Sequence, residues 1–146
     1  MDFLRYFLVS LVVYLGLLVG IILSFMAKEE LKPGKKYFLL THNIVLGFIL
    51  FFFLEFLDIN VYLTLFLPLI LVISSFYYKF KTNYIYFLLG IIFWLSFRSG
   101  RGSLLISSLI FFYGFLVSSM EFKAKKYYLI LLRNLWFFVC LLLYMI

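Results

Sequence analysis

The sequence predicts an all-α integral membrane protein with about six transmembrane helices. Hydrophobic residues make up 67% of the 146 residues and charged residues only 13%, with a mean hydropathy of +1.18. Soluble domains contain about half apolar and a quarter charged residues, so a soluble fold of this size would leave too much apolar surface exposed. Runs of about 18 or more apolar residues recur, and each is long enough to cross a bilayer as a helix.

Six apolar segments are the expected spans, and short polar gaps separate them. Helices are required, because backbone polar groups in hydrocarbon must be satisfied within the segment and the alternating pattern of barrel strands is absent. No gap is long enough for a soluble domain, so we expect residues 1–146 to form a single polytopic transmembrane domain. The segments are Phe3–Met26, Tyr37–Leu57, Val61–Tyr78, Tyr84–Phe97, Ser103–Met120 and Tyr127–Ile146.

Lysines predict how the spans are oriented. The first, third and fifth gaps are rich in lysine, whereas the second gap, "DIN", is acidic at Asp58. Lysine and arginine gather on the cytoplasmic side of a membrane. We therefore expect a multi-pass protein of the cell membrane with these three gaps in the cytoplasm and both termini outside. In the first gap, Pro33 and Gly34 are expected to turn the chain. The lysines are Lys28, Lys32, Lys35, Lys36, Lys79, Lys81, Lys123, Lys125 and Lys126.

An internal similarity suggests three helical hairpins in the same orientation. "GIILSFM" (residues 20–26) matches "GFLVSSM" (residues 114–120) at Gly, Ser and Met. After a basic gap, "GKKYFLL" (residues 34–40) similarly matches "AKKYYLI" (residues 124–130). Repeats of this kind are common in transporters.

The fourth segment is the shortest, and the Gly-rich turn "FRSGRGS" follows it. The simpler interpretation is that Arg98 and Arg101 snorkel to headgroups on the outer side, where they are candidates for binding anions. An alternative makes the fourth and fifth segments a re-entrant hairpin that carries both arginines into the membrane, which is costly unless they are paired.

Small residues at four-residue spacing predict close helix packing. Gly16, Gly20 and Ser24 lie in the first segment, and Gly114 and Ser118 in the fifth. Helices in lipid associate by close backbone approach, which such stripes permit. We expect Gly20 and Gly114 to lie at tight contacts between helices.

Polar side chains within the segments suggest a layer in the inner third of the membrane. His42 and Asn43 follow the first lysine-rich gap, and Arg133 and Asn134 follow the fifth. Ionisable residues inside spans are candidates for function, because hydrocarbon makes them costly. We interpret these four residues as a lipid- or partner-binding layer, with Arg133 holding an anionic headgroup or an acidic membrane partner. The simpler alternatives are that Arg133 snorkels to the interface and that His42 bonds a neighbouring helix.

Enzyme and nucleic-acid signatures are absent from the sequence. It contains no cluster of His, Cys, Asp and Glu for a metal, no Gly-rich phosphate loop, and only one histidine to serve as a base. We therefore expect no metal and no cofactor. The net charge of +7 would suggest nucleic acid in a soluble protein. Here the basic residues sit between apolar segments, so they indicate topology and anionic lipid instead.

The sequence favours a small non-catalytic membrane subunit that binds lipids with anionic headgroups, another membrane protein or a second copy of itself. One alternative is a minimal transporter or channel built from repeated hairpins. A second is an intramembrane enzyme that modifies a lipid and uses Arg133, or Arg98 and Arg101, to hold a phosphate. Solute flux, a stable co-purifying partner and lipid turnover would distinguish the three.

Overall fold

The chain is all-helical throughout the part that the structure describes. The computed structural model describes residues 3–27, 31–77, 82–100, 102–121 and 127–140. Six residues inside these ranges are described by their backbone alone, namely Leu31, Lys32, Lys35, Asn83, Tyr127 and Arg133. The elements are α1 (Phe3–Met26), α2 (Leu31–Phe56), α3 (Val61–Tyr77), α4 (Thr82–Ser99), α5 (Ser103–Glu121), α6 (Tyr127–Asn134) and α7 (Trp136–Val139). The predicted all-α class is therefore confirmed.

Three helices are long and apolar enough to cross a membrane. They are Phe3–Met26, Lys36–Phe56 and Ser103–Glu121, of 24, 21 and 19 residues. At about 1.5 Å per residue each approaches or exceeds the roughly 30 Å of a hydrocarbon core. The remaining apolar helices, Val61–Tyr77, Tyr84–Ser99 and Tyr128–Val139, are shorter.

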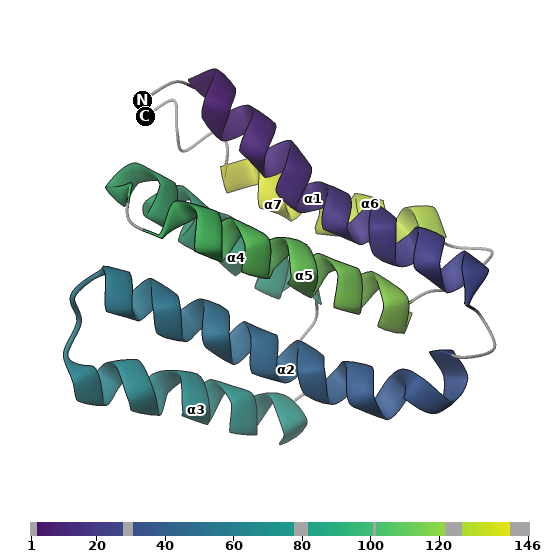
Figure 1. The fold of residues 1–146 in the computed structure, drawn as a ribbon, viewed down its shortest axis with the longest axis horizontal. Helices are drawn as coiled ribbons and strands as arrows, with labels where there is room; N and C mark the ends of the chain where they lie inside the picture. The colour runs from purple at the N-terminus through teal and green to yellow at the C-terminus, as the bar shows by residue number, and fades with distance from the viewer. Residues whose placement is uncertain (1–2, 28–30, 78–81, 101, 122–126, 141–146) are drawn as a thin grey trace.

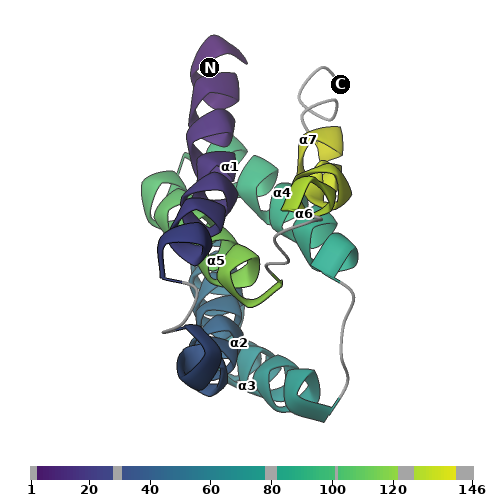
Figure 2. The ribbon, with the colours of Figure 1, turned by 90° about the vertical axis from the view of Figure 1, so that its right-hand side faces the viewer.

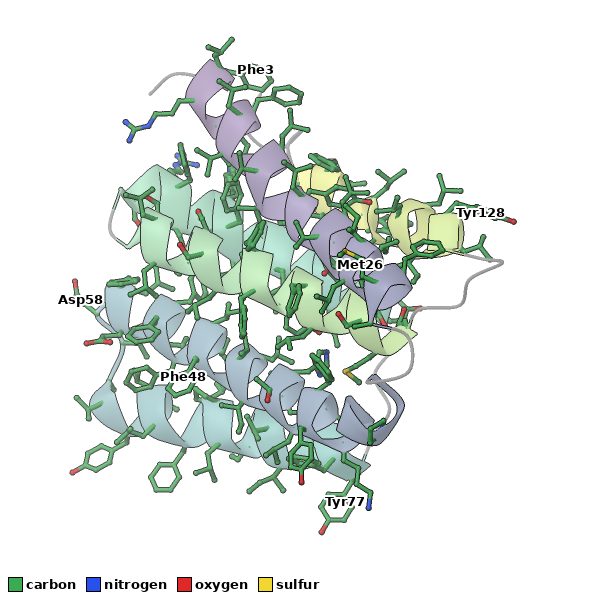
Figure 3. The ribbon with its side chains drawn as sticks, turned by 45° about the vertical axis from the view of Figure 1, so that its right-hand side comes forward. Phe3, Met26, Phe48, Asp58, Tyr77 and Tyr128 are labelled. Carbon is green, nitrogen blue, oxygen red and sulfur yellow. The ribbon has the colours of Figure 1, made fainter. Side chains whose placement is uncertain are left out.

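The helices run back and forth along one common direction (Figure 1). Phe3 and Asp58 lie toward one end of the bundle, while Met26, Tyr77 and Tyr128 lie toward the other (Figure 3). The last three residues border the three lysine-rich gaps. The described ends next to these gaps therefore share one end of the molecule.

The helices do not pack as the three expected hairpins. Helix α5 is central: it packs most extensively against α1 and also contacts α2 and α4, while α3 packs against α2, and α4 against α6 and α7. Among the described residues, few contacts join α1 with α2, α3 with α4, or α5 with α6, which are the pairs connected by the lysine-rich gaps. Figure 2 shows α2 and α3 below the other helices, with α2 next to α5, which it contacts as extensively as it contacts α3. Close packing in lipid follows small residues rather than connectivity, so sequence neighbours need not be partners.

The turn between α2 and α3 is built from local hydrogen bonds. Asp58 adopts a left-handed conformation (φ 53°) just past the end of α2. The N–H of Ile59 then reaches back to the Leu54 carbonyl at 3.3 Å, as in a Schellman motif. Asn60 caps α3, since its Oδ1 accepts a hydrogen bond from the N–H of Tyr62 at 3.0 Å.

The expected turn at Pro33 and Gly34 is wrong. Pro33 and Gly34 do not turn the chain, because α2 already begins at Leu31 and includes both residues. Proline is tolerated there, since the first-turn N–H groups of a helix have no partner within it. The described part of the expected last span is helical, with α6 and α7 joined at Leu135, which keeps helical angles (φ −60°, ψ −16°) and bonds the Leu132 carbonyl. Residues 141–146 of that span lie outside the described residues.

Candidate functional site

A cavity of about 270 Å³ lies between the α2–α3 pair and the α4–α5 pair. It is near the end of the bundle that borders the lysine-rich gaps, because Thr82 begins α4 and Glu121 ends α5. Ten residues line it, of which five are apolar and five are polar. The apolar side chains are Leu39, Leu46, Ile85, Val117 and Met120, and the polar ones are His42, Asn43, Ser75, Thr82 and Glu121.

His42 connects two helices across the wall of this cavity. Its Nε2 lies 2.8 Å from the hydroxyl oxygen of Tyr113 on α5, and its Nδ1 lies 3.0 Å from Oδ1 of Asn43. The imidazole also stacks on the Tyr113 ring, with centroids 4.7 Å apart. In a neutral imidazole one nitrogen accepts and the other donates. The two contacts are both satisfied when Tyr113 donates to Nε2 and Nδ1–H donates to Asn43.

Asn43 is the least satisfied of the polar residues in the lining. Its side chain is only 3% exposed, and its Nδ2 has no hydrogen-bond partner. An unpaired buried donor costs about 1–3 kcal/mol. Within the described part of the structure, this amide nitrogen is buried in the wall beside the cavity with its hydrogen-bonding capacity unused.

The hydroxyl groups of the lining already have acceptors. Thr82 donates to the Glu121 carboxylate, which joins the start of α4 to the end of α5. Ser75 donates to the Val72 carbonyl at 2.7 Å within α3. The cavity thus combines occupied hydroxyls, one carboxylate and the unpaired amide of Asn43.

The four residues of the expected polar layer do not all lie together. His42 and Asn43 line the cavity, whereas Asn134 is on α6 and does not. Asn134 is fully buried, and among the described residues neither polar atom of its side chain has a partner. The side chain of Arg133 lies outside the described part of the structure.

Two tyrosines that the sequence analysis did not select extend the buried polar region. Tyr113 bonds His42, and Tyr86 on α4 packs beside it with ring centroids 5.8 Å apart. Tyr86 is 2% exposed and its hydroxyl has no partner. Tyr113, near the middle of α5, was a usable signal, because tyrosine normally lies at the membrane interface. Tyr86 lies near the start of α4, where a tyrosine is ordinary.

The small residues of α1 lie directly against α5. A side chain at Gly16 would collide with the backbone carbonyl of Phe111, and one at Gly20 with the Phe115 carbonyl and the Ser118 hydroxyl. Only glycine permits this approach of the two backbones.

The facing stripe on α5 is also tightly enclosed. A Cβ at Gly114 would lie 3.2 Å from the backbone nitrogen of Leu17 and 3.1 Å from the Tyr86 hydroxyl oxygen. Ser24 and Ser118 turn their hydroxyls back to carbonyls of their own helices, at 2.7 Å and 2.9 Å. The stripe residues therefore serve the α1–α5 contact rather than the cavity.

Arg98, at the end of α4, lies at the opposite end of that helix from Thr82, which lines the cavity. Arg98 is exposed, and its guanidinium carbon lies 5.6 Å from the centre of the Trp94 ring. This is the geometry of a cation–π contact. Arg101 falls outside the described residues.

In the described part of the chain, no three His, Cys, Asp or Glu side chains lie close enough to hold a metal ion. Comparison with known proteins finds no family model, no curated protein and no solved structure that matches the chain.

Proposed function

We propose that this chain is a six-span, non-catalytic subunit of the cell membrane that binds a membrane lipid in the cavity between α2–α3 and α4–α5. The observation that carries the proposal is the amphipathic lining, in which five apolar side chains stand with five polar ones. A lipid presents the same combination at its glycerol region, where polar ester and phosphate groups adjoin apolar chains.

The surface beside the cavity supports a lipid more than a soluble ligand. Helix α3 packs mainly on α2 and exposes large apolar side chains along its outer face, including Phe66, Ile70, Ile73 and Phe76. A soluble protein does not leave so large an apolar surface uncovered. Acyl chains would lie on this face while the polar end of the same lipid enters beside Ser75.

The proposed orientation places the cavity in the cytoplasmic half of the membrane, with both termini outside. The positions of Met26, Tyr77 and Tyr128 toward one end of the bundle are consistent with it. Lysines at that end would gather anionic headgroups, at about 1 kcal/mol for each lysine near the surface. Arg133 remains a candidate for holding such a headgroup or an acidic partner.

The experiment fills the cavity and measures the lipid that co-purifies. Ser75→Phe places a ring in the lining, whereas Ser74→Phe alters the neighbouring residue, which does not line the cavity. We expect native mass spectrometry in mild detergent to show retained lipid for the parent and Ser74→Phe, and its loss for Ser75→Phe. Equal retention by all three proteins, each with an unchanged melting temperature, would refute lipid binding at this site.

A minimal transporter is the second candidate, and the buried polar side chains favour it. His42, Tyr113, Tyr86 and Asn134 give four different helices polar groups in the interior. Flux measured in proteoliposomes separates the two functions. Ion or solute flux above that of empty liposomes, abolished by His42→Phe, would support transport, and no flux is expected for a lipid-binding subunit.

A further inference from the structure

We propose that the Asn43 amide makes this cavity selective for an oxygen acceptor of a glycerolipid, an inference that rests on the proposed lipid-binding function. The ligand would place an ester carbonyl or a phosphate oxygen on Nδ2 of Asn43. Its acyl chains would leave the cavity over the apolar face of α3.

A chain of hydrogen bonds fixes which way the amide faces. When Tyr113 donates to Nε2 of His42, the imidazole carries its proton on Nδ1, which then requires the oxygen of Asn43. If His42 instead carried its proton on Nε2 and donated to Tyr113, both the Tyr113 hydroxyl hydrogen and the Asn43 oxygen would lack a partner. With Tyr113 as donor to His42, only the N–H groups of Asn43 Nδ2 remain unpaired, so this tautomer is the better satisfied one.

The rest of the lining offers no competing donor among the described side chains. The hydroxyls of Ser75 and Thr82 donate to the Val72 carbonyl and to Glu121, and Nδ1–H of His42 donates to Asn43. A ligand that enters with an acceptor satisfies a buried donor. A ligand that enters with only a hydroxyl or an ammonium group leaves that donor unpaired, which favours the acceptor.

The size of the cavity narrows the choice of ligand further. A volume of about 270 Å³ corresponds to about nine waters at roughly 30 Å³ each, which suits the glycerol region of a lipid but not a whole lipid. Acyl chains that leave over α3 are attached directly to the ester carbonyls of the glycerol region. We therefore expect an ester carbonyl, rather than the phosphate, to pair with Asn43.

Three lipids of matched chains test this assignment on delipidated protein by native mass spectrometry. Dioleoylphosphatidylcholine has both carbonyl and phosphate, its di-ether analogue lacks the carbonyls, and dioleoylglycerol lacks the phosphate. We expect the di-ether lipid to bind about tenfold more weakly than the diester, as for one lost hydrogen bond to a buried donor. A di-ether lipid that equals the diester while dioleoylglycerol fails would assign the acceptor to the phosphate. Equal binding of all three would overturn the inference.

Two variants distinguish this inference from the proposed function. Asn43→Leu removes the amide at similar volume and should weaken diester binding about tenfold, abolishing the preference over the di-ether lipid. Thr41→Val is the control, since this neighbour bonds the Tyr37 carbonyl and does not line the cavity.

If Ser75→Phe loses lipid but Asn43→Leu binds all probes as the parent does, the lipid site stands and the acceptor inference fails. If the parent retains no lipid, the proposed function itself fails. If Asn43→Leu does not fold, the three-lipid comparison on the parent decides alone.

Discussion

Replacing Gly16 by alanine should separate α1 from α5. The new Cβ would overlap the Phe111 carbonyl oxygen. It would also lie 2.9 Å from the carbonyl carbon and 3.1 Å from Cα of the same residue. All three are backbone atoms, so no side-chain rotation can relieve the collision. The helices must move apart instead, which loosens the packing of buried neighbours such as Val13, Leu17 and Ile21.

The expected loss of stability follows from two opposing effects. Overpacking costs about 1–3 kcal/mol, and a collision with backbone belongs at the upper end of that range. Alanine also returns about 1 kcal/mol of helix propensity relative to glycine. The free energy of unfolding should therefore fall by roughly 2 kcal/mol.

Equilibrium unfolding in mixed micelles, followed by tryptophan fluorescence, measures this change, and Gly34→Ala is the matched control. At Gly34 the nearest atom to a new Cβ is a ring carbon of Phe38 at 3.4 Å, an ordinary contact. The control should therefore keep or slightly gain stability. If Gly16→Ala is as stable as Gly34→Ala, the close α1–α5 contact is refuted.

Three further changes test other parts of the structure. Asn60→Ala removes the cap of α3 and should lower the free energy of unfolding by about 1 kcal/mol, and an unchanged value would contradict the capping role. Tyr113→Phe leaves Nε2 of His42 without its donor and should cost about 1–3 kcal/mol while weakening lipid retention, whereas parental stability and retention would argue against the hydrogen-bond chain. Gly34→Cys in a Cys140→Ser background should react with an impermeant thiol reagent in inverted vesicles but not in intact cells, and labelling of intact cells would overturn the proposed topology.

The helical class could be predicted because hydrocarbon permits few backbone structures. Which helices pack against one another could not be predicted. The stripe of Gly16, Gly20 and Ser24 indicated that one face of the first helix lies close to another helix, yet four-residue spacing carries no information about which one. The structure places this extensive contact on α5.

The candidate site was accessible to sequence reasoning only on one helix. His42 and Asn43 stood out because polar residues are rare inside apolar segments. Thr82 and Glu121 lie at helix ends, where polar residues are ordinary, and only folding brings them into the same cavity as His42.

Photocrosslinking tests the central claim, a lipid held in the cavity, most directly. A phosphatidylcholine with a diazirine near its glycerol backbone would be bound at trace concentration to the parent and irradiated, and the labelled peptides mapped by mass spectrometry. A lipid in the cavity predicts labels within 39–46 on α2 and 117–121 on α5, suppressed by excess unlabelled lipid and by Ser75→Phe. Labels confined to the outer face of α3, or insensitive to excess lipid, would contradict it.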